Sequence, residues 1–264
     1  MEARQEGPLY YQTPRKVQLF GVCCEAQPRQ INYLLDETDT IGCDGKRSHN
    51  PNTVASLLHH YFQVHGLHEE ECVLHADNCA GQNKNRTIMT YLAWRCLTGL
   101  HKKISLSFMI TGHTRCLVDC MFGLLKQRYR RADCYTMGQL CDVVNSSSIC
   151  NAAQTIPGSG LVLYEWDTFF EGLFRPIPQV SKQHHFLFSC ETPGIVDVKK
   201  LVDDNFTPVA ILKTAAEQVQ AAGLPNVLPP GGMSRERQTY LYKEIRPYVA
   251  DQWQDEVCPA PPPL

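Results

Sequence analysis

The sequence predicts an α/β fold in which a mixed sheet is flanked by helices. Between residues 17 and 131, short apolar runs typical of strands alternate with stretches in which apolar residues recur at helical spacing. The elements follow the order strand, strand, helix, strand, helix, strand, helix, so a parallel unit begins only at the third strand. With 264 residues, 43% of them hydrophobic, the chain is long enough to bury a sizeable core.

The first two strands are predicted to form a hairpin. Residues 17–25 (VQLFGVCCE) and 30–35 (QINYLL) are short, apolar and partly β-branched or aromatic, and residues 26–29 (AQPR) have the composition of a turn. A helix follows, because apolar residues fall at i, i+3, i+4, i+7 and i+8 from Val54 to Phe62. Gly66 marks its end.

Two further strands and two further helices complete the regular region. Residues 71–77 (ECVLHAD) form a short apolar run, and residues 86–97 (RTIMTYLAWRCL) are apolar on too many sides for a surface helix. Between residues 104 and 110, large apolar residues alternate with serine or methionine, which is typical of a strand with one buried face. Helical spacing resumes at Leu117 and leads into the basic stretch 126–131, which suits a helix C-terminus.

The second half of the chain is predicted to be a smaller, irregular α+β region. We divide the chain into an N-terminal arm, an α/β domain, a C-terminal extension and a Pro-rich tail, with boundaries at 1–16, 17–146, 147–258 and 259–264. Within the extension we expect a short helix over 166–174, a hairpin formed by 185–189 and 195–198, a linker over 225–232, and a final helix capped by Ser234.

Charge and hydropathy restrict the classes of function. The formal charge is −2, so there is no overall basic field for nucleic acid, and any polyanion site must be a local patch. No run of eighteen apolar residues occurs, and residues 1–12 are polar and acidic. We therefore expect an intracellular protein with no membrane partner, and the nucleus is a compatible location.

Cysteine usage leaves a zinc-dependent binding module open as one class of function. The 13 cysteines are odd in number and irregularly spaced, which argues against a disulfide framework. His75 and Cys79 are close in sequence, as are His113 and Cys116, and Cys120 follows four residues after Cys116. The tight CxxC spacing of structural zinc sites does not occur.

Asp77 is the first candidate site residue, because it ends a strand and opens a polar loop. A carboxylate at a strand tip is suited to Mg²⁺ or Mn²⁺, which take oxygen ligands. The loop also carries carboxamides and a cation that can contact nucleic acid: Asn78, Gln82, Asn83, Lys84 and Asn85. The alternative is structural, with an asparagine capping the next helix.

Asp119 is the second candidate, near the start of a helix and 119 − 77 = 42 residues from Asp77. It can instead stabilise the helix N-terminus. The same helix ends in a basic run that can contact phosphates, consisting of Lys126, Arg128, Arg130 and Arg131. His113 precedes the helix as a supporting residue, either in the chemistry or as a hydrogen-bonding loop residue.

These residues carry a resemblance to an uncharacterised animal family of transposase-derived proteins. The resemblance covers nearly the whole chain, and its most specific parts are HADNCAGQNKN (75–85) and Gly112-His113-Thr114 followed by Asp119, Phe122-Gly123 and Lys126. It implies a ribonuclease H-like fold related to DDE transposases and integrases. On that resemblance, Asp77 and Asp119 match the second and third catalytic carboxylates, which would hold Mg²⁺ or Mn²⁺.

The chain departs from the family pattern at two places. The resemblance places the first carboxylate on a central strand upstream of residues 7–11, and the first aspartate of this chain is Asp36. The family's Lys-Phe-Ser-Pro is replaced by Arg115-Cys116-Leu117-Val118. Glu25, Asp36 and Glu37 lie on or just after the hairpin and are not expected to substitute for the missing carboxylate.

Three functions follow as hypotheses. The first is a domesticated, catalytically inactive transposase-like protein, N-terminally incomplete, that binds DNA or a protein partner. The second is an active metal-dependent nuclease or polynucleotidyl transferase that uses Asp77 and Asp119. The third is the zinc-dependent module.

Overall fold

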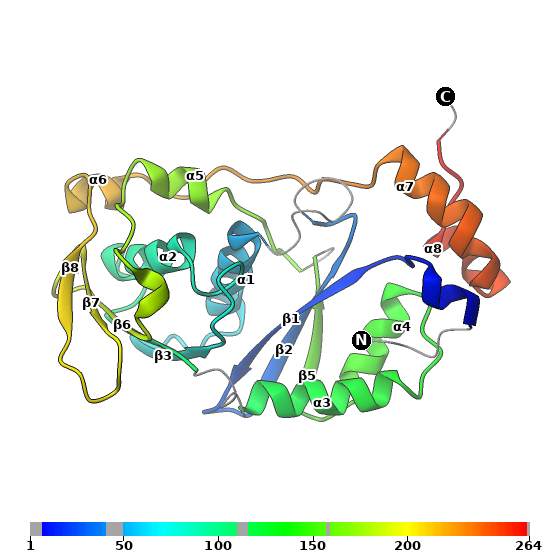
Figure 1. Cartoon of the computed structure of the whole chain (residues 1–264), viewed down its shortest axis with the longest axis horizontal. Helices are drawn as coiled ribbons and strands as arrows, with labels where there is room; N and C mark the ends of the chain where they lie inside the picture. Colours follow the sequence, from blue (N-terminus) through cyan, green and yellow to red (C-terminus); the bar gives the residue numbers. More distant parts are fainter. Residues whose placement is uncertain (1–6, 41–49, 110–115, 157–158, 263–264) are drawn as a thin grey trace. The chain divides into compact units, whose positions relative to one another are not determined.

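The chain folds into two compact units. A computed structural model describes residues 7–40, 50–109, 116–156 and 159–262 (Figure 1). The first unit combines residues 1–48, 115–161 and 229–264, and the second combines residues 49–114 and 162–228. Each unit is therefore assembled from segments that are distant in the sequence.

The first unit contains a three-stranded mixed sheet in the order β1-β2-β5. β1 (Val17–Cys24) pairs antiparallel with β2 (Arg29–Asp36), and β2 pairs in parallel with β5 (Asn151–Thr155). The predicted hairpin is thus confirmed, and β5 is a strand that the sequence did not indicate.

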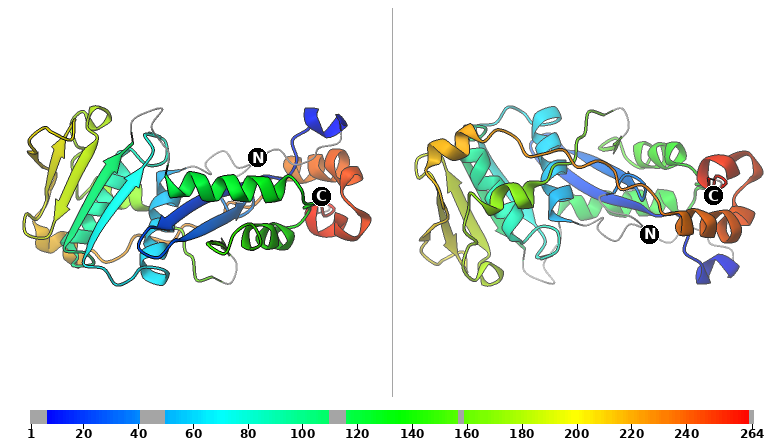
Figure 2. Two further views of the ribbon diagram at one scale, coloured as in Figure 1. Left: turned by 90° about the horizontal axis from the view of Figure 1, so that it is seen from below. Right: turned by 90° about the horizontal axis from the view of Figure 1, so that it is seen from above.

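Two helices cover one face of this sheet. α3 (Leu117–Tyr129) runs along β1 and β2 in the left view of Figure 2, and α4 (Met137–Asn145) packs beside it. Their buried side chains meet the sheet in a small core of Leu34, Leu125, Val143 and Val144. α4 begins with a capping box, because Thr136 Oγ1 accepts from Gln139 N–H and the Gln139 side chain accepts from Thr136 N–H.

The first and last parts of the chain lie side by side in the first unit (Figure 1). Short helical segments pack around a second small core that contains Leu241, Ile245, Val249 and Val257, with Leu9 against it. Ser234 caps the predicted final helix as expected, its Oγ accepting from Arg237 N–H at 3.2 Å. The segments are η1 (Gly7–Tyr11), α7 (Arg235–Tyr240), η4 (Leu241–Ile245, a short π-helix), η5 (Arg246–Tyr248), η6 (Asp251–Trp253) and α8 (Gln254–Val257).

The second unit contains a five-stranded mixed sheet in the order β3-β4-β6-β7-β8. β3 and β4 are parallel and the remaining pairs are antiparallel. The predicted hairpin is confirmed as β6 and β7. The strands lie side by side in the left view of Figure 2, and their bounds are β3 (Glu71–Ala76), β4 (Lys103–Phe108), β6 (His185–Ser189), β7 (Ile195–Lys199) and β8 (Thr207–Ala210).

Helices bury one face of the five-stranded sheet. α2 packs against β4 and β6, and α1 and α5 pack against α2. Nearly every residue of α2 is buried, as its all-round apolar sequence predicts. An aromatic cluster that includes Tyr91, Trp94 and Trp166 fills the space between these helices. The bounds are α1 (Pro51–Val64), α2 (Arg86–Leu97), α5 (Trp166–Glu171), η3 (Val180–Lys182) and α6 (Ala216–Ala221).

The α/β class with mixed sheets flanked by helices is confirmed, and the arrangement is consistent with a ribonuclease H-like fold. The expectation of a single sheet is wrong, because no strand in the described residues joins β1 to β3, and each of these strands lies at the edge of its own sheet. The division of the chain at residues 16, 146 and 258 stays a prediction, beside which the structure shows two interleaved units. Within the described ranges, no helix combines the length and hydropathy needed to cross a membrane.

Candidate functional site

Asp77 closes the loop that follows β3. Its Oδ1 accepts hydrogen bonds from the Cys79 backbone N–H at 3.1 Å and from Asn83 Nδ2 at 2.8 Å. The backbone N–H groups of Gln82, Asn83 and Lys84 all donate to the Cys79 carbonyl. The side chain of Asp77 is exposed, and one of its two carboxylate oxygens is committed to holding this loop.

The neighbouring carboxamides also build the loop. Asn85 Oδ1 accepts from the Ile88 backbone N–H at 3.1 Å and so caps α2, while its Nδ2 donates to the carbonyls of Ala80 and Gln82. Asn78 Nδ2 donates to the Met109 carbonyl at 2.6 Å and ties the loop to the end of β4. The density of asparagines in this segment is therefore explained locally.

Lys84 does not present its ammonium group to solvent. The residue is 6% exposed, and Nζ donates to Asn78 Oδ1 at 3.0 Å and stands 5.1 Å from the centre of the Phe108 ring. Burial lowers the pKa of this amine from its ordinary value. The contact of Lys84 with nucleic acid stays a prediction, and it would require this side chain to leave Asn78.

Asp119 lies in the first turn of α3, in the first unit, whereas Asp77 lies in the second. Its Oδ2 accepts from the Cys116 thiol at 3.4 Å, and its side chain is exposed. No single compact unit contains both carboxylates, so their pairing in one catalytic site stays a prediction. His113 lies outside the described residues.

The basic end of α3 forms an exposed cationic surface, which we call the α3 patch. Its members are Lys126, Arg128, Arg130 and Arg131, all exposed. Arg128 Nε donates to Ser146 Oγ at 3.1 Å, which orients this guanidinium without neutralising it. Over the described ranges, none of the four forms an ion pair with a carboxylate. The patch therefore keeps its full charge toward solvent.

The expected Mg²⁺ or Mn²⁺ site, with Asp77 and Asp119 as ligands, stays a prediction. Mg²⁺ is usually held by one or two carboxylates together with water and substrate oxygens. Asp77 and Asp119 belong to no group of three metal-ligating side chains in the described part of the chain. Asp36 and Glu37 are paired with arginines. The group that does occur is Glu69, Cys72 and His101, which the sequence reasoning missed.

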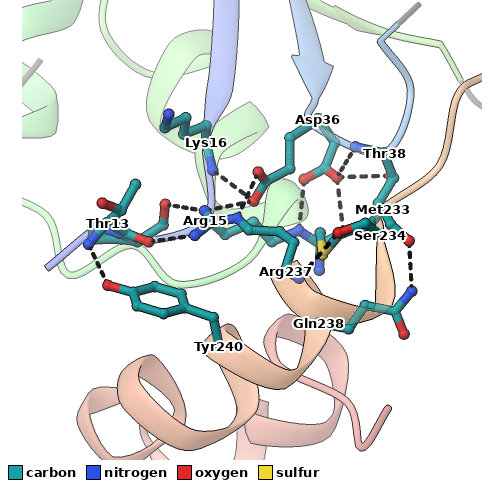
Figure 3. Close-up of polar contacts among 12 residues, drawn as sticks. Thr13, Arg15, Lys16, Asp36, Thr38, Met233, Ser234, Arg237, Gln238 and Tyr240 are labelled. Atoms are coloured by element: carbon teal, nitrogen blue, oxygen red, sulfur yellow. Dashed lines mark hydrogen bonds and ion pairs between the residues drawn. The ribbon is translucent and has the colours of Figure 1, made fainter. Parts of the chain in front are cut away.

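A buried ionic arrangement, which we call the terminal clasp, was also missed. It consists of Arg15, Asp36, Glu37 and Arg237, and Figure 3 labels Arg15, Asp36 and Arg237. Arg15 donates to both carboxylate oxygens of Asp36 at 2.8 and 2.9 Å, and Arg237 donates to both oxygens of Glu37 at 3.1 Å. Burial alone would raise the pKa of Asp36, but hydrogen bonds from Arg15 and Thr38 hold it below its ordinary value. The clasp joins the two ends of the first unit.

A buried arginine stands at the centre of the second unit. Arg95, 4% exposed, donates through Nε to His101 Nδ1 at 3.1 Å and through Nη1 to Tyr91 Oη at 3.0 Å. Burial, together with the Arg95 charge, lowers the pKa values of His59 and His101 to about 4. Both imidazoles are therefore neutral at physiological pH.

The chain belongs to the family defined by a domain of unknown function, DUF7869, whose profile matches residues 16–204. The matched range includes β1 through β7, the Asp77 loop and the α3 patch, and stops before α7. No curated protein and no solved structure matches the chain. The terminal clasp thus links residues inside the matched range, Asp36 and Glu37, to Arg237 beyond it.

Proposed function

We propose that this protein is a transposase-derived, catalytically inactive protein that binds the phosphate backbone of DNA through the α3 patch. The single observation that carries the proposal is the gathering of four exposed cations, none paired with a carboxylate within the described residues, at the end of one helix. Contacts of this kind release counterions from DNA and give affinity that falls with salt.

The proposed lack of catalytic activity is supported by the structural contacts that the carboxylates make. Asp77 Oδ1 accepts two hydrogen bonds within its own loop, and Asp36 and Glu37 are paired with Arg15 and Arg237. The active nuclease remains the competing proposal. It predicts that the purified chain cleaves DNA with Mg²⁺ or Mn²⁺ and loses this activity on Asp77→Asn, and that result would overturn the inactive assignment.

Fluorescence anisotropy with a labelled DNA duplex tests the binding proposal. We expect the logarithm of affinity to fall linearly with the logarithm of salt concentration, by about 0.9 per neutralised phosphate. Replacing Arg128, Arg130 and Arg131 together by alanine should weaken binding at every salt concentration and flatten this slope.

A charge-matched control separates the α3 patch from net charge. Lys103, Lys182 and Lys200 are exposed cations of the second unit, and their combined replacement by alanine removes the same total charge. We expect this control to bind like the parent. Equal weakening by both triple variants, or affinity that does not change with salt, would remove the α3 patch from consideration.

A further inference from the structure

Three metal-ligating side chains converge at one end of the five-stranded sheet, away from the Asp77 loop. Glu69 precedes β3, Cys72 is its second residue, and His101 precedes β4 by two residues. β3 and β4 are parallel with Glu71 opposite Lys103, so the starts of both strands lie at the same edge. The ligand atoms of the three side chains all lie within 4.8 Å of one another.

The imidazole of His101 lacks a hydrogen-bond partner at the nitrogen that faces this group. His101 is 4% exposed, and its buried Nε2 has no partner within the described residues. Glu69 Oε1 lies 3.8 Å from Nε2, beyond hydrogen-bond distance. An unsatisfied polar atom of this kind is costly, and coordination of a metal ion to Nε2, after the proton on Nε2 has moved to Nδ1, would remove the cost.

The donor set selects the class of ligand. A thiolate, an imidazole and a carboxylate are the ligands that Zn²⁺ takes in proteins, whereas Mg²⁺ and Ca²⁺ take oxygen ligands. We propose that Glu69, Cys72 and His101 bind Zn²⁺, with a fourth position left for water. The side chain of Glu69 is 26% exposed, which gives the ion and this water access to solvent.

Binding requires a change of tautomer at His101. Arg95 Nε donates to His101 Nδ1 at 3.1 Å, which places the proton of the neutral ring on Nε2. Coordination through Nε2 moves this proton to Nδ1. Because Nδ1–H and Arg95 Nε–H would then both be donors, the guanidinium turns its Nε–H away from the ring and stays anchored through the bond from Nη1 to Tyr91 Oη. The Cys72 thiol releases one proton to solvent as the thiolate forms. This site differs from the zinc candidates of the sequence analysis, which were His75, Cys79, His113, Cys116 and Cys120.

The test measures zinc bound by the full-length chain. Protein stripped with a chelator is dialysed against Zn²⁺, washed, and analysed for metal by mass spectrometry. We expect one zinc ion per chain in the parent and its loss in Cys72→Ser. The matched control is His75→Gln with Cys79→Ser, which changes two exposed candidate ligands on β3 and in the following loop. This control should retain the ion.

Two further measurements keep the proposal open to refutation if Cys72→Ser folds poorly. Glu69→Gln changes a partly exposed side chain and should weaken zinc binding in a chain with the parent's circular dichroism. Co²⁺ should give the parent a thiolate-to-cobalt charge-transfer band that Glu69→Gln weakens and Cys72→Ser abolishes. Less than stoichiometric zinc in the parent, retention by Cys72→Ser and Glu69→Gln, or equal loss in the His75 and Cys79 control would each overturn the assignment.

Discussion

Arg237 and Glu37 form a bidentate ion pair across 200 residues of sequence, with both contacts at 3.1 Å. The carboxylate side chain is 2% exposed and the guanidinium 12% exposed. Arg237 also donates to the carbonyls of Thr13 and Pro14, so a single guanidinium holds two other segments of the first unit, residues 13–14 and Glu37 (Thr13 and Arg237 are labelled in Figure 3). The terminal clasp therefore links the N-terminal and C-terminal segments of that unit through ion pairs.

Breaking the clasp should destabilise the first unit strongly. Arg237→Met leaves the Glu37 carboxylate buried without its partner, and the loss of one member of a buried pair costs about 3–5 kcal/mol. Urea unfolding followed by circular dichroism measures this loss. Asp255→Asn is the control, because Asp255 is 93% exposed in its pair with Arg246, and we expect a change of at most about 1 kcal/mol there. Equal losses in the two variants would contradict the assignment.

Stability should fall as the pH is lowered from neutrality. Burial, with the charges of Arg95 and His60, lowers the pKa of His59 to about 4, whereas the imidazole titrates near 6.5 in the unfolded chain. Between these values the unfolded state binds a proton that the native state does not, so the free energy of unfolding decreases as the pH falls.

For His59 alone, the expected loss between pH 7 and pH 5 is about 2 kcal/mol. Urea midpoints at the two pH values measure it, and the difference should be smaller in His59→Gln. Parent and variant are compared because Asp36 and His101 also titrate differently in the folded state. An unchanged difference in His59→Gln would assign the pH dependence to other groups.

Gly21 is expected to be intolerant of a larger residue. A Cβ atom at this position in β1 would lie 2.6 Å from Phe122 Cζ of α3. Gly21→Ala should therefore force the ring to shift and destabilise the protein by about 1–3 kcal/mol. Gly123, within α3, has no atom within 4 Å of its added Cβ. Gly123→Ala should stabilise the helix by roughly 0.5–1 kcal/mol, so thermal melts of the two variants should shift in opposite directions.

Substitutions at Asp77 distinguish a loop anchor from a metal ligand. An asparagine Oδ1 can still accept from Cys79 N–H and Asn83 Nδ2, whereas alanine cannot. We expect Asp77→Asn to melt like the parent and Asp77→Ala to lose about 1 kcal/mol. We also expect Mn²⁺ to leave the parent's melting temperature unchanged. A rise with Mn²⁺ that Asp77→Asn abolishes would instead favour the nuclease.

Elements with strong periodicity were predictable from the sequence. Residues 86–97 were expected as a buried helix, and α2 has these bounds because Asn85 caps its start and its apolar faces all find partners. β5 was not predictable, because NAAQT lacks the apolar or β-branched pattern of a strand. Its conformation depends on pairing with β2 and on Asn32 Nδ2 donating to Asn151 Oδ1 at 3.2 Å, and both depend on distant sequence.

The candidate sites also divide into those that the sequence predicts and those that depend on the tertiary structure. The Asp77 loop and the α3 patch are contiguous in sequence, so residue types alone identified them. The grouping of Glu69, Cys72 and His101 depends on the register between β3 and β4, which no local pattern encodes. The proposed partnership of Asp77 with Asp119 assumed one continuous domain, and the separation of the chain into interleaved units leaves that assumption without support.

The interleaving of the two units also has a consequence for biosynthesis. A ribosome adds residues from the N-terminus, and domains generally fold as their last segments emerge. All segments of the second unit have been synthesised once residue 228 has appeared. The hairpin of β1 and β2 belongs to the first unit and gains two of its contacts later. These are the ion pair of Glu37 with Arg237 and the hydrogen bond from Arg15 to the Val257 carbonyl at 2.9 Å. During translation the hairpin therefore exists without its ion pair to Arg237 and its contact with Val257 until residues 229–257 have been synthesised.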